Sequence, residues 1–250
     1  MLRKAYRQFW KDIGTTDPYF GVLTHEQYRA DKLDEAALNE FFDSGELHIN
    51  RTMQVFAKTW PDYHQPIKRA LDFGCGAGRL SLALSAHAQS VTGVDISPGM
   101  LEQAEHHRLR LGKENVDFRL IEGNTGFLQG TYDYIHSTMV FQHIAPQEGM
   151  EILDYLLSKL EEGGRIFLLL TYWNKSSTRS RWISFLNFSL PRLRKFFKPG
   201  KDYAFPMFDY DLNEVFAALQ RHNIRHTKTT FGHTGNHWYI RLYALKHARK

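Results

Sequence analysis

Residues 69–95 have the sequence RALDFGCGAGRLSLALSAHAQSVTGVD, and this stretch decides the fold. A short apolar run ends in three alternating glycines, Gly74, Gly76 and Gly78, and a second apolar run ends at Asp95. Glycine permits a positive φ and lets a ligand lie against bare backbone. A helix that begins after such a loop presents free N–H groups and a positive dipole end, which suit a carboxylate or phosphate. The stretch therefore predicts a strand, a ligand-binding loop, a helix and a second strand.

The same alternation of elements continues along the chain. Short apolar runs at 116–121, 132–137 and 165–172 are separated by segments whose apolar residues recur every three or four positions. Gly163 and Gly164 predict a helix stop before the last of these runs. Strand–helix alternation predicts an α/β fold with a doubly wound, mostly parallel sheet. Two further strands, near 226–231 and 238–245, are expected to form a terminal hairpin around the turn GHTGNH.

The chain divides into a cap and a main domain. Residues 1–65 show no strand alternation and predict an N-terminal helical cap, which Pro61 and Pro66 close. Residues 66–250 are expected to form the α/β domain, with an insertion at 173–210 where the alternation breaks. The helix predicted at 211–222 has Asp211 at its N-cap and Glu214 at the capping-box position.

Composition limits the classes of protein to consider. A chain of 250 residues suffices for one sizeable domain with an accessory segment. Its one cysteine, Cys75, cannot form an intramolecular disulfide, and the N-terminus has no apolar stretch typical of a signal peptide. No run of about 18 apolar residues is present to span a membrane. We therefore expect a cytoplasmic protein.

The positive charge of the chain is concentrated in one segment. Between Lys175 and Lys201 there are eight basic residues and no acidic ones, and residues 179–201 interleave them with aromatic side chains. This pattern is typical of an amphipathic segment on an anionic membrane, of a lid over an anionic or lipid-like acceptor, or of a helix pair that buries its aromatics. Nucleic acid is not an expected partner, because no recognition motif accompanies the charge.

The glycine loop distinguishes between nucleoside cofactors. A dinucleotide site requires a third glycine where this chain has Arg79. The sequences LDFGCGAGRL and VTGVDISPGML instead resemble the first two motifs of the class I methyltransferases, which bind S-adenosylmethionine and release S-adenosylhomocysteine. The resemblance covers residues 69–172 and extends to the terminal hairpin. It implies a Rossmann-like, seven-stranded sheet that ends in an antiparallel strand pair.

The resemblance implies specific roles for residues at the strand ends. Asp72 and the three glycines of the loop would hold the methionine part of the cofactor. Asp95, 21 residues after Gly74, would bind the ribose hydroxyls, as its position also predicts. The remaining contacts implied are Ile96 along the adenine, Glu122 with Gly123 and Asn124 at the adenine amino group, and Ser137 and Thr138 near the sulfonium.

The N-terminal sequences DPYFGVLT (17–24) and SGELHI (44–49) resemble those of a subgroup of uncharacterised bacterial methyltransferases. In such enzymes the N-terminal helices commonly lie over the cofactor. Tyr19 and Phe20 therefore either cover the methionine end or serve in helix packing.

The segment after the fourth predicted strand bears on the acceptor. It lacks the Asn/Asp-Pro-Pro-aromatic motif of DNA amino-methyltransferases and the Pro-Cys nucleophile of cytosine-C5 enzymes. Ubiquinone-pathway O-methyltransferases have acids where this chain has Met139 and Gln142, so no metal site is expected. His143 is the candidate general base, with packing beneath the next helix as its alternative, and Tyr172 is expected to face the same mouth.

Three other histidines have simpler interpretations. His136 is expected to be a core histidine inside its strand, and His233 and His237 to be polar residues of the hairpin turn.

The sequence thus predicts methyl transfer from S-adenosylmethionine, by SN2 displacement, to oxygen or nitrogen of a small-molecule acceptor such as a glycan or lipid-linked intermediate. An NAD-type oxidoreductase and a non-catalytic cofactor-binding partner protein are the alternatives. Nothing in the sequence indicates the oligomeric state.

Overall fold

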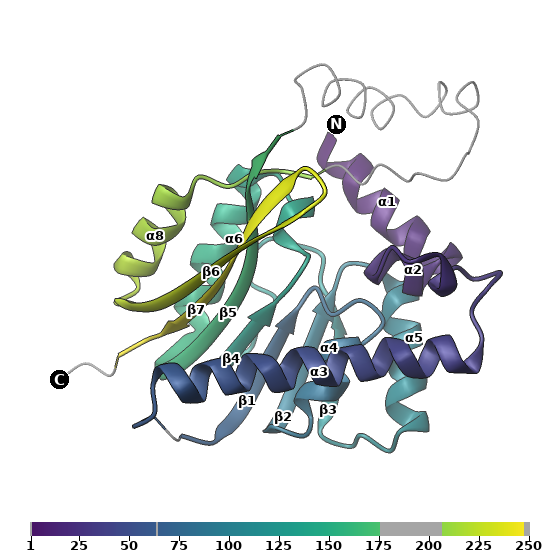
Figure 1. Cartoon of the computed structure of the whole chain (residues 1–250), viewed down its shortest axis with the longest axis horizontal. Coiled ribbons are helices and arrows are strands. Elements are labelled where there is room, and N and C mark those ends of the chain that lie inside the picture. Colours follow the sequence, from purple (N-terminus) through teal and green to yellow (C-terminus); the bar gives the residue numbers. More distant parts are fainter. Residues whose placement is uncertain (1, 64, 176–206, 248–250) are drawn as a thin grey trace.

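The computed structural model describes residues 2–63, 65–175 and 207–247, with side chains from Tyr6 onward (Figure 1). The basic aromatic segment 179–201 lies outside the described residues, so its membrane, lid and packing interpretations stay predictions. In the described residues no helix combines the length and apolar character needed to cross a bilayer.

The core of the fold is a seven-stranded sheet with the order β3-β2-β1-β4-β5-β7-β6. Its strands are β1 (Ile67–Phe73), β2 (Ala88–Asp95), β3 (Val116–Leu120), β4 (Tyr132–Ser137), β5 (Leu160–Asn174), β6 (His226–Thr234) and β7 (His237–Leu245). The first five strands are parallel, whereas β7 runs antiparallel to both β5 and β6. The predicted mostly parallel sheet with an antiparallel terminal pair is confirmed.

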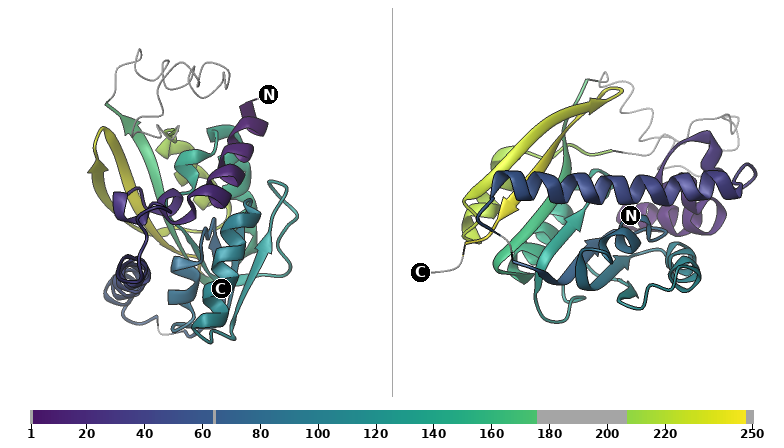
Figure 2. Two further views of the ribbon diagram at one scale, coloured as in Figure 1. Left: turned by 90° about the vertical axis from the view of Figure 1, so that its right-hand side faces the viewer. Right: turned by 60° about the horizontal axis from the view of Figure 1, so that its bottom comes forward.

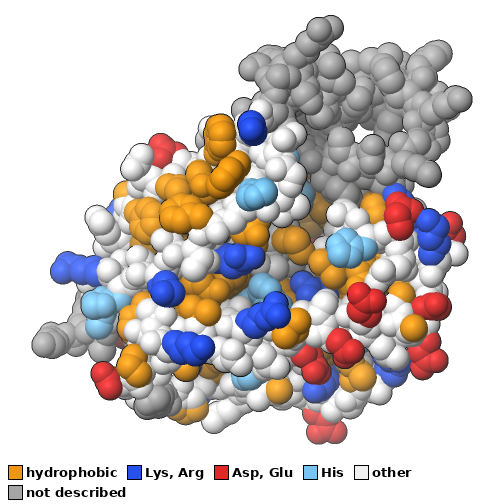
Figure 3. Space-filling model, viewed as in Figure 1, with side chains coloured by type: hydrophobic (Ala, Val, Ile, Leu, Met, Phe, Trp, Pro, Cys, Tyr) orange, Lys and Arg blue, Asp and Glu red, His pale blue; other side chains and the backbone are white. Residues whose placement is uncertain are grey.

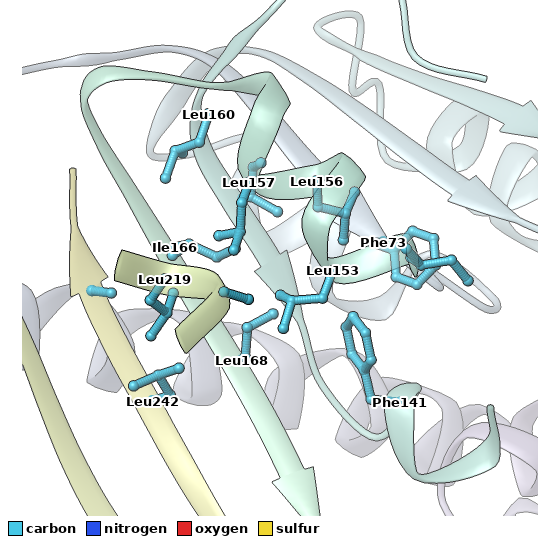
Figure 4. Close-up of a cluster of buried hydrophobic side chains, with 14 of the residues drawn as sticks. Phe73, Phe141, Leu153, Leu156, Leu157, Leu160, Ile166, Leu168, Leu219 and Leu242 are labelled. Atoms are coloured by element: carbon cyan, nitrogen blue, oxygen red, sulfur yellow. The ribbon is translucent and has the colours of Figure 1, made fainter. Parts of the chain in front are cut away.

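Helices cover both faces of this sheet. Helices α6 (Pro146–Lys159) and α8 (Leu212–Arg221) pack leucines and other apolar side chains on one face, where Leu153, Leu168 and Leu242 meet (Figure 4). Helices α3 (Glu35–Thr59) and α4 (Arg79–Leu84) pack on the other face. Helix α5 (Pro98–Arg110) follows β2 and contacts β3. Because helices cover both faces, the carboxyl ends of the parallel strands remain accessible at one edge of the sheet, where a ligand site is expected.

The N-terminal region is helical, as its sequence predicts. Helix α1 (Leu2–Thr16), the short α2 (Pro18–Val22) and a 3-10 turn η1 (Glu26–Tyr28) precede the long α3. Asp34 caps α3 by accepting a hydrogen bond from the backbone N–H of Ala37 at 2.7 Å. Figure 2 shows α3 running along the sheet, while α1 and α2 lie at the end where the parallel strands finish.

The prediction that the glycine pair 163–164 stops a helix is wrong. Helix α6 ends at Lys159, and both glycines lie inside β5. The pairing of β5 with β4 shifts register there, because Tyr132 pairs with Leu160 but Tyr134 pairs with Arg165. Gly163 has a φ of +77°, so the pair accommodates a bulge rather than a helix end.

The boundaries near the hairpin also differ from expectation. Strands β6 and β7 reach Thr234 and His237, so only Gly235 and Asn236 form the turn. Strand β5 continues to Asn174, and its Trp173 pairs with Trp238, so the first residues assigned to the insertion belong to the sheet. Asp211 caps α8 by accepting a hydrogen bond from the N–H of Asn213, as its N-cap assignment predicts.

Candidate functional site

A cavity of about 260 Å³ opens at the carboxyl ends of β1, β2 and β4. Five predicted cofactor-binding residues line it directly from the strand ends and the loops that follow β1 and β2: Asp72, Gly74, Gly76, Asp95 and Ile96. Gly123 and Thr138 line it from the loops that follow β3 and β4. The parallel sheet therefore brings most of the predicted site together.

The glycine loop has the backbone that its sequence predicts. Gly74, Gly76 and Gly78 have φ angles of +75°, +52° and +83°. A Cβ on Gly74 would lie 2.3 Å from a methyl of Val140, and one on Gly76 would lie 2.7 Å from a methyl of Val22. Gly78 does not line the cavity; it is the N-cap from which α4 begins. Both positive φ and close approach thus require glycine here.

Asp72 is a buried acid at the floor of the cavity. Its Oδ2 accepts a hydrogen bond from the Ser81 hydroxyl at 2.6 Å. Burial raises the pKa of Asp72 to about 6, although the Ser81 hydrogen bond and the charge of Arg79 act in the opposite direction. A cationic amino group in the cavity would favour the ionised acid, which fits the role implied for Asp72.

Arg79 is a cavity residue whose role the sequence did not reveal. The sequence distinguished it only as the residue that replaces a dinucleotide glycine. Its side chain is buried, donates to the Ser44 hydroxyl of α3 at 3.1 Å and lines the cavity. Burial lowers its pKa to about 10, whereas the charge of Asp72 raises it. Arg79 therefore contributes a buried cation beside the buried acid.

Asp95 joins the glycine loop to the start of α5. Its two carboxylate oxygens accept hydrogen bonds from the N–H groups of Gly76 and Ser97, each at 2.9 Å. Burial raises the pKa of Asp95, while these backbone donors lower it. Each oxygen retains acceptor capacity toward hydroxyl groups in the cavity.

Of the three residues expected at the adenine amino group, only one lines the cavity. Glu122 is exposed and is not among the residues that line the cavity, and Asn124 points its amide to Arg7 and Glu151. Contacts of Glu122 and Asn124 with adenine therefore stay predictions, and Gly123 alone of the three reaches the cavity.

The end of β4 supplies the other wall. The Ser137 hydroxyl is buried and donates to the Phe73 carbonyl at 3.0 Å, so it fastens β4 to β1 outside the cavity lining. The Thr138 hydroxyl is also buried, but it has no hydrogen-bond partner among the described residues. Met139 follows with a φ of +58°, a strained conformation for a side chain of this size, and also lines the cavity.

His143 lines the same cavity from the 3-10 turn η2 (Phe141–His143). Its Nε2 lies 3.1 Å from the Gln142 amide nitrogen, and its ring centroid is 4.8 Å from that of Trp10 in α1. The turn itself is held by Tyr210, whose hydroxyl donates to the carbonyls of Phe141 at 3.0 Å and Ile144 at 2.9 Å. No local sequence signal pointed to Tyr210.

The structure does not bring Tyr172 to the cavity. Its ring lies 6.0 Å from that of Phe231 on β6, and it is not among the lining residues. An acceptor contact by Tyr172 therefore stays a prediction. His136 is a core histidine, as predicted, because it is fully buried between the Tyr134 hydroxyl at 2.9 Å and His48 at 3.2 Å. His233 is exposed at the end of β6, and His237 is partly buried at the start of β7.

The N-terminal helices cover the cavity, but through residues other than Tyr19 and Phe20. Tyr19 places its hydroxyl 2.6 Å from Nε2 of His107 on α5, and the Phe20 ring lies beneath the Arg29 guanidinium. The residues that line the cavity are Tyr6, Arg7 and Trp10 of α1 with Gly21 and Val22 of α2. Tyr19 and Phe20 therefore serve in helix packing.

The residues present fit S-adenosylmethionine. A buried acid stands where a cationic amino group would bind, the loop leaves no room for a Cβ, and the Thr138 hydroxyl has no hydrogen-bond partner within the described ranges. Asp95 lies at the end of the second strand with acceptor oxygens for ribose hydroxyls.

Comparison with known proteins agrees with this geometry. Residues 70–164 match the family model described as a methyltransferase domain. Ubiquinone biosynthesis O-methyltransferases of Dechloromonas aromatica and Xylella fastidiosa are 27% and 33% identical over 151 and 102 residues. These matches cover 59% and 40% of this chain and 64% and 40% of the relatives, so the chain spans less than two thirds of their length.

Solved structures share the fold at lower identity. Magnesium protoporphyrin IX methyltransferase from Synechocystis PCC 6803, with bound S-adenosylhomocysteine, superimposes with a TM-score of 0.61 at 19% identity over 96% of this chain and 99% of that chain. A methyltransferase from Methanosarcina mazei gives 0.56 at 20% identity over 75% and 96%. Residues 70–164 therefore match a methyltransferase domain, and together with the glycine loop and the strand order this match supports a class I S-adenosylmethionine-dependent methyltransferase.

Proposed function

We propose that this chain transfers a methyl group from S-adenosylmethionine to oxygen or nitrogen of a small-molecule acceptor. The observation that carries the proposal is that Asp72, Gly74 and Asp95 line the same cavity as His143 and Trp10. When bound, S-adenosylmethionine supplies a methyl group on a cationic sulfur, and a nucleophile that bonds to the methyl carbon breaks its bond to sulfur, so that the neutral thioether leaves. The names of the relatives above, which are O-methyltransferases, favour oxygen as the acceptor atom.

The chain's own residues bind and orient the reactants. Asp72 neutralises a cationic amino group, Asp95 accepts from the ribose hydroxyls, and Thr138 offers a hydroxyl that no other described residue engages. Helix α1 covers one side of the cavity with Tyr6, Arg7 and Trp10, which would limit the access of water. Holding the reactants in line in a site without water contributes much of the acceleration expected for a displacement.

His143 serves as the general base in this proposal. The Gln142 amide nitrogen can only donate, so Nε2 is the unprotonated nitrogen of the neutral ring, and we assign proton acceptance to Nε2, which exchanges this donor for the proton of the acceptor. Acceptor hydroxyl and amine groups gain from a base that removes their proton as the new bond forms. Tyr210 fixes the turn that carries this imidazole.

Two measurements test the proposal. Calorimetry should show binding of S-adenosylhomocysteine, with Asp95→Asn weakening it by roughly 1–3 kcal/mol. Transfer of a labelled methyl group should then be screened over phenols, amines, glycans and lipid-linked acceptors, and His143→Ala should lower the rate without changing cofactor affinity. Tighter binding of NAD than of S-adenosylhomocysteine would instead support an oxidoreductase, and cofactor binding without transfer to any acceptor would support a non-catalytic partner protein.

A further inference from the structure

The carboxyl end of β5 and the hairpin β6–β7 share an aromatic surface. Trp173 and Phe231 are 50% and 62% exposed, the highest values for any Phe, Tyr or Trp in the described part of the chain. The Trp173 ring lies 6.0 Å from that of Trp238, and the Phe231 ring lies 6.0 Å from that of Tyr172. We call these four residues the aromatic edge. Exposed apolar groups that cluster in this way mark an interaction site more often than scattered ones do.

This edge adjoins the cavity. Thr171, the residue before Tyr172, donates its hydroxyl hydrogen to the Phe208 carbonyl, and Phe208 lines the cavity. On the other side, the backbone N–H of Lys175 donates to the carbonyl of Asn236 in the hairpin turn at 2.8 Å. The aromatic edge therefore lies at the same end of the sheet as the cavity, with a lysine beside it.

Strands β6 and β7, and β5 from Gly163 onward, contain no acidic residues. Residues 163–201 contain nine lysines and arginines, and residues 215–250 contain seven, together half of the 32 in the chain. Neither range contains any of the 27 acidic residues. The charges are separated on the face shown in Figure 3: lysine and arginine side chains gather over the β6–β7 side, and acidic side chains lie mostly over the N-terminal helices.

We propose that the aromatic edge docks onto the surface of an anionic lipid bilayer. Trp, Tyr and Phe side chains favour the boundary between headgroups and acyl chains, and nearby cations are attracted to anionic headgroups. Single-stranded nucleic acid is the less suitable occupant. Base stacking needs open ring faces, whereas the Tyr172 and Phe231 rings pack against each other at 79°.

Docking at this edge goes beyond the proposed methyl transfer. It would bring the cavity, which Phe208 lines, next to the lipid. An acceptor dissolved in the bilayer could then reach the cavity without crossing water.

The experiment is flotation of the full chain with vesicles of phosphatidylcholine alone or mixed with phosphatidylglycerol. We expect binding to the mixed vesicles only, and binding at least about tenfold weaker for the double variant Trp173→Ser/Phe231→Ser, which removes the exposed apolar area. Leu120→Ser is the matched control, because Leu120 is 45% exposed on β3 at the opposite edge of the sheet. It should bind like the unaltered chain.

Several results would overturn the proposal: no binding to the mixed vesicles, equal binding by the double variant, or an equal loss in the Leu120→Ser control. Tight binding of a single-stranded RNA homopolymer together with no vesicle binding would favour nucleic acid instead. Calorimetry with S-adenosylhomocysteine on the double variant checks folding, because neither substituted residue lines the cavity. Retained cofactor binding would leave the proposed methyl transfer intact whatever the vesicles show.

Discussion

The guanidinium of Arg7 lies 2.9 Å from the carboxylate of Glu148 across the mouth of the cavity. Arg7 also donates to the Glu122 carbonyl at 3.0 Å and to the Asn124 side chain at 2.8 Å. One side chain of α1 is thereby joined to the loop after β3 and to the first turn of α6. These contacts hold α1 against the cavity that Arg7 lines.

Arg7→Ala should therefore release the cofactor product faster. Loss of one partly buried ion pair and two further hydrogen bonds is expected to cost about 1–2 kcal/mol, or a roughly five- to thirtyfold faster dissociation of S-adenosylhomocysteine. Stopped-flow displacement measures this rate. Lys11→Ala removes a cation from the same helix outside the cavity lining and should leave the rate unchanged. An unaltered rate in Arg7→Ala would show that α1 does not limit release.

Tyr210→Phe should destabilise the protein, because the Ile144 carbonyl loses the Tyr210 hydroxyl and the Phe141 carbonyl keeps only the Ile144 N–H as a donor. We expect the free energy of unfolding to fall by about 1–3 kcal/mol in denaturant titrations. Tyr132→Phe is the contrasting control, since the buried Tyr132 hydroxyl has no hydrogen-bond partner among the described residues. That variant should be neutral or stabilising, and equal losses in both would contradict the role assigned to Tyr210.

Cofactor affinity should depend on the ionisation of Asp72. Burial raises the pKa of Asp72 to about 6, and a cationic amino group binds the ionised form. The dissociation constant of S-adenosylhomocysteine should therefore increase as the pH falls below about 6, by up to about tenfold per pH unit. Calorimetry between about pH 7.5 and 5 measures it. Asp72→Asn should bind weakly with a much flatter profile, and a flat profile in the unaltered chain would refute the role of Asp72.

The pair formed by His48 of α3 and His136 of β4 should make the protein sensitive to acid. Burial lowers the pKa of His48 to about 4, helped by the charges of Arg79 and Arg241, and it lowers the pKa of His136 well below its ordinary value. The unfolded chain takes up protons at a higher pH than the folded one. Stability from the neutral pair is therefore complete above the ordinary histidine pKa of about 6.5 and is lost as the pH falls toward 4.

His48→Phe should reduce this loss. Denaturant titrations at about pH 7 and pH 5 should show that the free energy of unfolding falls less in the variant, by about 1–3 kcal/mol. The comparison also cancels the opposite contribution of Asp72, whose raised pKa favours the folded state as the pH falls. If both proteins lose the same free energy between these pH values, the pair is not the acid-sensitive element.

The sequence predicted the first half of the sheet and most of the residues that line the cavity from the strand ends, because the relevant signals are local. Alternating glycines require positive φ whatever surrounds them, and apolar periodicity distinguishes strand from helix within a few residues. Asp72 and Asp95 follow directly from their positions at strand ends, and both line the cavity. The helix stop predicted at Gly163 was wrong, because this glycine belongs to a bulge in β5 that depends on the pairing of β5 with β4.

Contacts between distant segments could be seen only in the tertiary structure. The pairing of Arg7 with Glu148 joins residues 141 positions apart, and Tyr210 reaches the Phe141 carbonyl across 69 positions. Neither contact leaves a local pattern, since each depends on how helices and loops pack against the finished sheet. The contact between the rings of Tyr172 and Phe231 likewise depends on the pairing of distant strands in the sheet. The sequence by itself determined the loop and acids that suit the cofactor, because backbone conformation and strand position are local properties. Only the packed structure showed which helix covers the cavity and which side chains from distant segments line it, because those contacts depend on tertiary packing.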